Sequence, residues 1–167
     1  TVGAWAPASA ANFTTARAGH AALVSNGYLY VLGGESNGGS AWQDDVQFAR
    51  INANDGTLGV WAAASPFTQK RAWLAGAAYN GYLYILGGWT GGSNLNDVQY
   101  AKVNPADGTL GAWATTTPFQ TGRNALAAAV FNGYLYVLGG WAGSADQNDV
   151  QFAKLNADGT IGAWAPT

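Results

Sequence analysis

The chain has 167 residues, with 24 Gly, 8 Trp, 8 Tyr and 6 Phe, no Cys and no Met, a charged fraction of 10% and a net charge of −2. Soluble domains carry about 25% charged residues, so this composition favours packed strands and tight turns over a helical bundle or disorder. The absence of Cys excludes disulfides, thiolate metal sites and cysteine nucleophiles.

The few Lys and Arg are spread along the chain and form no basic patch, so we expect no nucleic-acid partner. No stretch approaches the ~20 apolar residues of a membrane-spanning helix, so we expect no membrane partner either. The chain as given shows no targeting segment, and its compartment is left open.

One sequence pattern occurs three times along the chain. The segment Gly27 to Gly34 returns at residues 81–88 and 133–140, and Asp45 to Ala49 returns at 97–101 and 149–153. Residues 55–59 return at 107–111 and 158–162, each followed by a Trp (Trp61, Trp113 and Trp164). When residues 45–96 are aligned with 97–148, more than half of the positions are identical and no gap is needed. A period of this length indicates a repeated structural unit.

Each repeat predicts four short strands. The first is rich in Ala and Gly, over residues 17–25, 71–79 and 123–131, and an Asn-Gly pair typical of hairpin turns follows it. The second is a continuous apolar run at 28–32, 82–86 and 134–138, as expected of a strand buried on both faces. The third begins at Asp45, Asp97 and Asp149 and alternates apolar with polar residues. The fourth is expected over 57–61, 109–113 and 160–164.

Four antiparallel strands in about 50 residues are typical of a propeller blade, so the predicted fold is an all-β propeller segment. We expect one domain over 1–167, with blades at about 14–63, 66–115 and 119–167 and an extra strand of the fourth type at 1–7. The small residues of the first strand suit the innermost position, where blades converge.

The repeat resembles the Kelch repeat. The resemblance rests on the Gly-Gly pair after a Tyr-containing strand, the Trp of the last strand and the Arg that opens the first. Arg17 and His20 keep the Arg–His spacing that Kelch repeats favour, whereas Leu74 and Leu126 replace the His. Kelch-like propellers include scaffolds, adaptor subunits, lectin-like proteins and some enzymes, so the resemblance implies a fold and leaves the function open.

Kelch-like rings usually have six or seven blades, so three blades leave two apolar sheet faces without a neighbour. We expect a homodimer that completes a six-bladed ring. A nine-bladed trimer and a chain cut from a longer array are the alternatives. Residues 1–7 and 160–166 both match the fourth strand. We expect one of them to pair in a terminal blade and the other to be displaced, disordered or exchanged between subunits.

Catalytic and metal-binding residues are not evident. His20 is the only His and lies in an Ala-rich segment, and no His–carboxylate set suits zinc or iron. The copper-radical oxidases that share this fold need a Cys, which this chain lacks. Asn52 to Gly56 faintly resembles a calcium loop, but Ala63 stands where the last ligand would be, and we interpret the segment as a turn. We therefore predict no enzyme, no cofactor and no metal.

Two sets of residues are candidates for ligand binding. Arg17, Arg71 and Arg123 recur at one position; we interpret them as structural partners of Asp45, Asp97 and Asp149, and alternatively as a ring that captures an anion. Trp89 and Trp141 follow the Gly-Gly pairs, in the variable loops after the second strand, which span 35–44, 89–96 and 141–148, and Trp73 is an additional Trp in the first strand of its own repeat. These side chains either pack between blades, which we favour, or stack on a sugar ring.

The sequence thus favours a non-enzymatic propeller module, a self-associating scaffold for protein interaction or structure. A lectin-like carbohydrate-binding propeller is the alternative. A fragmentary or engineered propeller without a ligand remains the third possibility.

Overall fold

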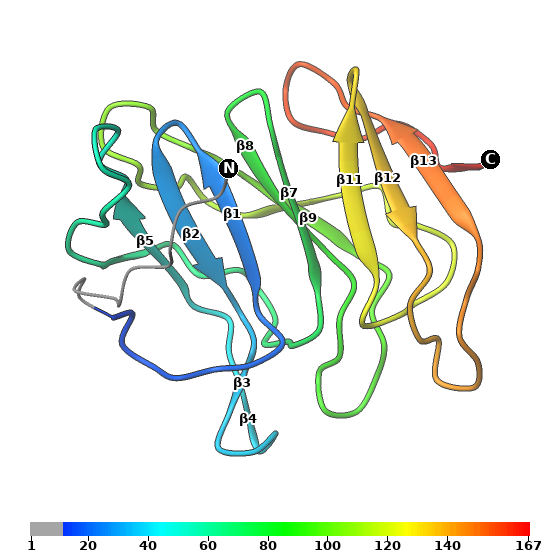
Figure 1. Ribbon diagram of the computed structural model, residues 1–167. Helices are drawn as coiled ribbons and strands as arrows, with labels where there is room; N and C mark the ends of the chain where they lie inside the picture. Colours follow the sequence, from blue (N-terminus) through cyan, green and yellow to red (C-terminus); the bar gives the residue numbers. More distant parts are fainter. Residues whose placement is uncertain (1–11) are drawn as a thin grey trace, which may run out of the picture.

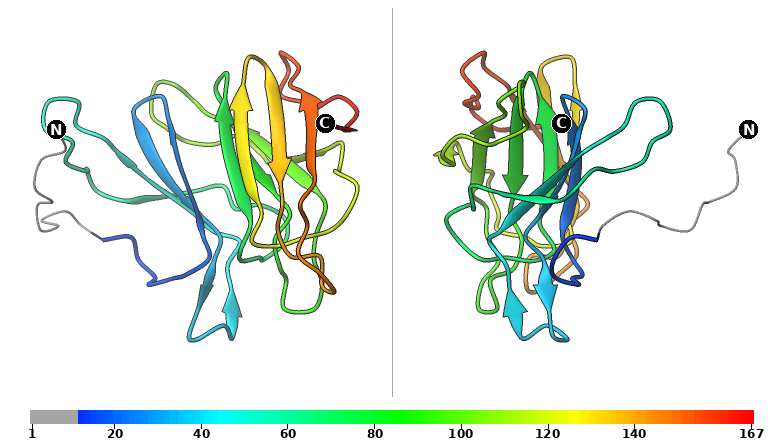
Figure 2. Two further views of the ribbon diagram at one scale, coloured as in Figure 1. Left: turned by 45° about the vertical axis from the view of Figure 1, so that its right-hand side comes forward. Right: turned by 90° about the vertical axis from the view of Figure 1, so that its left-hand side faces the viewer.

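The computed structural model describes residues 12–167 of the chain. Three four-stranded antiparallel sheets fan out side by side, and their inner strands contact one another (Figures 1 and 2). The first blade contains β1 (Ala21–Ser25), β2 (Tyr28–Leu32), β5 (Val46–Arg50) and β6 (Ala62–Ala64). The second contains β7 (Ala75–Tyr79), β8 (Tyr82–Leu86), β9 (Val98–Lys102) and β10 (Ala114–Thr116). The third contains β11 (Ala127–Phe131), β12 (Tyr134–Leu138), β13 (Val150–Lys154) and β14 (Ala165–Pro166).

The predicted all-β fold with three four-stranded antiparallel blades is confirmed. The Asn-Gly turns have the positive φ angles that a two-residue hairpin needs, with 50° at Asn26 and 78° at Gly27. The inner strands β1, β7 and β11 are neighbours, and small residues allow their close approach. A Cβ at Gly76 would lie only 3.0 Å from the Cβ of Ala21.

Three details differ from the sequence prediction. The first strand of each blade begins four residues after its Arg, because the residue two positions before the strand (Gly19, Trp73 or Ala125) has a positive φ that interrupts the extended backbone. The fourth strand lies at residues 62–64, 114–116 and 165–166, after the Trp instead of before it. In the predicted segment the first blade forms only an isolated bridge between Ile51 and Leu58. The loop after β2 also contains a small hairpin, β3 (Glu35–Ser36) with β4 (Ala41–Trp42).

The C-terminal strand of the fourth type is paired, since Phe152 of β13 faces Ala165 of β14. The matching segment 1–7 lies outside the described residues. Within residues 12–167, no helix is long and apolar enough to span a membrane.

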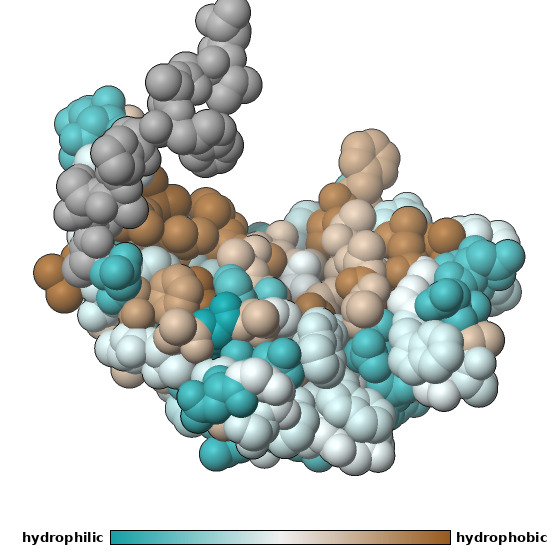
Figure 3. All heavy atoms as spheres, turned by 60° about the horizontal axis from the view of Figure 1, so that its bottom comes forward, coloured by the Kyte–Doolittle hydropathy of each residue, from teal (hydrophilic) through white to brown (hydrophobic). Residues whose placement is uncertain are grey.

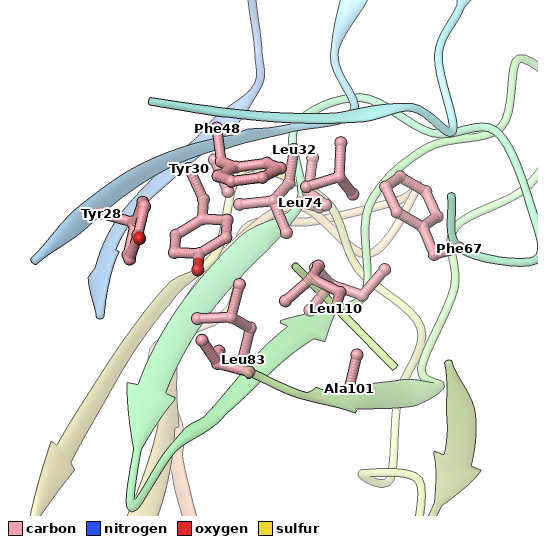
Figure 4. Close-up of a cluster of buried hydrophobic side chains, with 13 residues drawn as sticks. Tyr28, Tyr30, Leu32, Phe48, Phe67, Leu74, Leu83, Ala101 and Leu110 are labelled. Carbon is pink, nitrogen blue, oxygen red and sulfur yellow. The ribbon is translucent and has the colours of Figure 1, made fainter. Parts of the chain in front are cut away.

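The core consists of two layers, one between each pair of neighbouring blades (Figure 4 shows the first). In the first layer, the aromatic rings of Tyr28, Tyr30 and Phe48 pack toward aliphatic side chains of the second blade, among them Leu83 and Leu110. The second layer repeats this arrangement between the second and third blades. Each blade therefore has one face of aromatic type and one of aliphatic type.

Candidate functional site

The side chains of the three repeated arginines are buried and form ion pairs with the partly exposed aspartates that precede the third strands. The Arg71 guanidinium donates to both carboxylate oxygens of Asp97, at 2.5 and 2.9 Å, and to the carbonyl of Gly87. Its Nε donates to the carbonyl of Gln69, and its side chain is 0% exposed. Arg17 and Arg123 repeat these contacts with Asp45 and Asp149. These bidentate pairs are the structural role that the sequence predicted.

These guanidinium groups have few free N–H donors left to bind an anion. In Arg71, bonds to Gln69, Gly87 and Asp97 already occupy the Nε–H, both Nη1–H groups and one Nη2–H. Each guanidinium also lies over a Phe ring, at 5.7 Å for Phe67. The arginines hold the loop after the second strand against the segment before the first strand, and so brace the blade.

A buried Gln completes each of these networks. The role of this Gln was not predicted from the sequence. Gln99 donates to Asp97 at 2.9 Å, and its side-chain oxygen accepts the N–H of Thr68. Gln47 and Gln151 do the same in the other blades. The threefold Asp-x-Gln spacing was the signal that could have revealed them, because an amide at a fixed spacing from the Asp in every repeat implies a repeated bond.

The electrostatics of the pairs agree with this geometry. Burial pushes the pKa of Asp45 upward, but the bonds from Arg17 and Gln47 outweigh it, and the pKa lies below its usual value. Hydrogen bonds from Arg123, opposed by burial, lower the pKa of Asp149. These carboxylates therefore stay ionised and paired at neutral pH.

His20 lies beside the first of these networks. Burial, and then the charge of Arg17, lower its pKa below the usual value, and its Nδ1 is buried without a partner among the described residues. Its ring lies 6.1 Å from that of Phe13. Across the described part of the chain, no three His, Asp or Glu side chains gather in a way that could hold a metal ion.

The Asp-Gly segments are turns in the structure. Asp55 accepts bonds from the N–H and the hydroxyl of Thr57, and Gly56 has a φ of 75°. Asp107 and Asp158 bind Thr109 and Thr160 in the same way. The Thr hydroxyl and N–H hold the pKa of all three carboxylates below the usual value. A hollow of about 520 Å³ lies against the first of these turns, between Arg50 and Gly59.

The three candidate tryptophans differ in exposure. Trp73 is 38% exposed and Trp141 is 40% exposed, whereas Trp89 is half-buried. Trp89 and Trp141 occupy one position in the repeat and form bridges to Ala72 and Asn124. Trp73 precedes β7 in the chain and has a φ of 52°, a strained value for a bulky residue. Gly19 and Ala125 occupy the matching position with φ of 60° and 52°, so the backbone requires this conformation and Trp73 is an unusual occupant.

Two apolar sheet faces, one at each end of the row of blades, have no neighbouring blade within the described residues. The aromatic face of the third blade, by the repeat, comprises Ala127, Ala129, Tyr134, Tyr136, Leu138, Val150 and Phe152. The aliphatic face of the first blade comprises Ala22, Val24, Leu29, Val31, Ala49, Ile51 and Leu58. Ala22 and Val24 are exposed and Leu29, Ile51 and Leu58 are half-buried, whereas Val31 and Ala49 are only 3% and 1% exposed. Figure 3 shows apolar surface in two areas along the upper side of the view, a larger one on the left and a smaller one right of the centre.

With this geometry established, comparisons with known proteins identify the repeat. The model of the Kelch motif matches residues 74–100 and 122–151. This chain carries Kelch motifs. Its three four-stranded sheets are consistent with Kelch blades, as the Gly-Gly pair and the Trp of each repeat predicted. The ion pairs described above recur in all three blades.

Several Kelch-type relatives share this similarity. Beta-scruin of Limulus polyphemus is 28% identical over 141 residues, which cover 83% of this chain and 15% of beta-scruin. Alpha-scruin of the same organism is 28% identical over 136 residues, or 80% of this chain and 14% of alpha-scruin. The human Kelch domain-containing protein 1 is 28% identical over 133 residues and is covered to 32%. The chain thus spans a small part of the length of these relatives.

The fold also resembles a solved structure of YjhT, with a TM-score of 0.71 and 18% identity. The match covers 90% of this chain and 46% of the YjhT chain. This similarity concerns the arrangement of the blades and extends over less than half of the solved chain.

Proposed function

We propose that this chain is a non-enzymatic propeller module that self-associates into a six-bladed ring of two copies and serves as an interaction or structural scaffold. The observation that supports this most is the unequal burial of equivalent residues. Leu32 and Leu86 are 0% exposed because a following blade covers them, whereas Leu138 is 36% exposed. Phe131, at the edge of the same sheet, is 74% exposed.

Exposed apolar area of this kind favours association. Burial of one large aliphatic or aromatic side chain contributes about 1.5–3 kcal/mol. In the third blade Leu138 is exposed and Tyr136 is half-buried, whereas their equivalents in the second blade, Leu86 and Tyr84, are fully buried. Closed cyclic assemblies of two copies are the commonest way in which a soluble protein removes such surface.

The molar mass in solution tests the proposal. Light scattering behind a sizing column should give twice the chain mass of 17.2 kDa at micromolar concentration. A mass of one chain at the highest soluble concentration would end the proposal, and three chain masses would indicate a nine-bladed ring instead.

The scaffold role has a separate test. A variant that loses the Arg–Asp network of one blade should still bind through the loop face, provided that the blade remains folded. Hydrogen exchange of the assembled ring, measured with and without a candidate protein partner, should show protection confined to loops 35–44, 89–96 and 141–148. Protection elsewhere would place the binding surface on another part of the ring.

Carbohydrate binding is the second candidate, and Trp73 is the observation that favours it. Gly19 and Ala125 adopt the same backbone conformation at the equivalent positions, so the fold does not require an indole there. The partly exposed Trp73 ring, held in a strained backbone conformation, is therefore available to stack on a sugar. A glycan array should give a signal that Trp73→Gly removes while the unfolding midpoint stays within a few degrees. No signal for the unmodified protein would leave the scaffold role alone.

A further inference from the structure

We infer that the two copies join head to tail, so that the aromatic face of the third blade receives the aliphatic face of the first blade of a second copy. This inference rests on the self-association proposed above and specifies its mode. Two such contacts, related by a twofold axis along the channel, close the ring.

The chain contains two examples of this contact. Between the first two blades, the rings of Tyr28, Tyr30 and Phe48 meet aliphatic residues of the second blade, Ala78, Leu83, Ile85, Ala101, Val103 and Leu110. Between the second and third blades, the rings of Tyr82, Tyr84 and Tyr100 meet Val130, Leu135, Val137, Ala153, Leu155 and Ile161. The same two surfaces are thus complementary twice, with different residues in detail.

The aromatic face of the third blade is already arranged for this contact. Tyr136 stacks on Phe152 with a centroid distance of 6.1 Å and an interplanar angle of 27°. In the covered blades, Tyr30 stacks on Phe48 at 5.7 Å and 21°, and Tyr84 on Tyr100 at 6.2 Å and 23°. Because the uncovered pair has the geometry of the covered pairs, a second copy can dock with little rearrangement.

The aliphatic face of the first blade carries matching residues. By repeat position, Val24, Leu29, Val31, Ala49, Ile51 and Leu58 correspond to the six residues of the second blade that cover the first. Val24 is 58% exposed, whereas its equivalents Ala78 and Val130 pack against the covered cores. Val31 and Ala49 are already 3% and 1% exposed, so the part of this face that a second copy would newly cover is formed by the exposed Val24 and the half-buried Leu29, Ile51 and Leu58.

The glycine in the turn between the third and fourth strands lies against a Tyr of the preceding blade. A Cβ at Gly108 would lie 2.7 Å from Tyr28 of the preceding blade, and one at Gly159 would lie 2.6 Å from Tyr82. At Gly56 a Cβ would meet nothing within 4 Å. In the head-to-tail arrangement, Tyr134 of the second copy takes this place.

A hydrogen bond accompanies that close approach. The hydroxyl of Tyr30 donates to the carbonyl of Gly108 at 2.8 Å. The turn at 52–56 has the same length as the turn at 104–108, whereas the turn at 156–159 is one residue shorter. Tyr136 of one copy is therefore expected to donate to the carbonyl of Gly56 in the other.

Backbone bonds around the inner strands give the same direction. The N–H of Trp73 donates to the carbonyl of Gly19 at 2.6 Å, and the N–H of Ala125 donates to the carbonyl of Trp73 at 2.8 Å. The N–H of Gly19 and the carbonyl of Ala125 stand at the two ends of this series of bonds. When the first blade of one copy follows the third blade of the other, the N–H of Gly19 in one copy can donate to the carbonyl of Ala125 in the other.

A mixing experiment distinguishes this mode from one in which the same face of each copy meets its counterpart. Val24→Arg places a charge on the aliphatic face and Leu138→Arg places one on the aromatic face, both at positions that are exposed in the single chain. Thr115→Arg, on β10 of the covered middle blade and exposed there, is the matched control. Thermal unfolding of each variant, measured as a monomer at low concentration, shows that each is folded.

Analytical ultracentrifugation should give a dimer for the unmodified protein and for Thr115→Arg, and at least a tenfold weaker dimer for either face variant. An equimolar mixture of Val24→Arg and Leu138→Arg should dimerise more strongly than either alone, because one intact contact remains between the unmodified faces. If one variant stays fully dimeric, or the mixture gains nothing, the head-to-tail mode is overturned while self-association stands. A monomeric unmodified protein overturns both.

Discussion

The second and third blades share most of their sequence and have equivalent strands, yet their aromatic faces differ in burial. Tyr84 and Leu86 are 0% exposed, whereas Tyr136 is half-buried and Leu138 is 36% exposed. The third blade lies over the first of these faces, and within the described residues no further blade lies over the second. Burial in this protein is therefore a property of neighbouring blades, as in other repeat architectures.

The comparison also separates two kinds of interaction. The Arg–Asp–Gln networks lie within one blade and its adjoining loops, so they are equally complete in the second and third blades. The aromatic rings act between blades, so their contribution depends on what covers them.

Truncation of equivalent leucines should show the largest contrast. Leu86→Ala removes a fully buried side chain and should lower the free energy of unfolding by about 3 kcal/mol. Leu138→Ala should cost less than about 1 kcal/mol in dilute solution, because the side chain is exposed there. Urea unfolding measures both.

The same pair of variants reports on assembly. When the protein concentration is raised above the dimerisation range, the cost of Leu138→Ala should approach that of Leu86→Ala, because the second copy then covers it. A cost for Leu138→Ala that does not depend on concentration would contradict burial of this face by a second copy.

Loss of an ion pair should show no contrast between the blades. Arg71→Met and Arg123→Met each leave a carboxylate, Asp97 or Asp149, and a buried loop carbonyl without their donors. We expect each to cost about 2 kcal/mol, below the range for fully buried pairs because the aspartates are partly exposed. Chemical denaturation should give values equal within about 0.5 kcal/mol. A much larger loss at Arg71 would mean that its network also supports a contact between blades.

Acid should give the smallest effect, and it should be common to all three blades. The pKa values of Asp55, Asp107 and Asp158 are lower in the folded protein than the usual 3.8, since Thr side chains and N–H groups bind the ionised form. Their contribution to stability is therefore complete above about pH 4 and is lost as the pH falls through the folded pKa values. Thermal unfolding between pH 2 and 6 measures this loss, and replacing all three by Asn should flatten the acid limb. An acid limb unchanged by that replacement would assign it to Asp45 and Asp149.

Local signals predicted most of the blade. The Asn-Gly pairs, the apolar second strands and the Asp that precedes each third strand were correct because each depends on a few neighbouring residues. The fourth strand was displaced in the prediction, since Trp113 anchors it from outside the ladder by donating to the carbonyl of Ser65 at 2.8 Å. That contact joins residues 48 positions apart and has no local signature.

The candidate site divides in the same way. The pairing of the Arg and Asp series followed from their recurrence, whereas the exposure of Trp73 and Trp141 and the half-burial of Trp89 required the placement of loops that differ between repeats. The strained backbone at Trp73 was also invisible in the sequence, because Gly, Trp and Ala share that position without a common chemical property.

By itself the sequence determined the repeat, the strand order within each blade and the turns that join the strands, because these depend on side-chain alternation and on the few residues that accept a positive φ. Only the tertiary structure decided which faces are covered and which are open. The physical reason is that each sheet has two apolar faces of different shape, and which of them is buried depends on the blade that lies beside it.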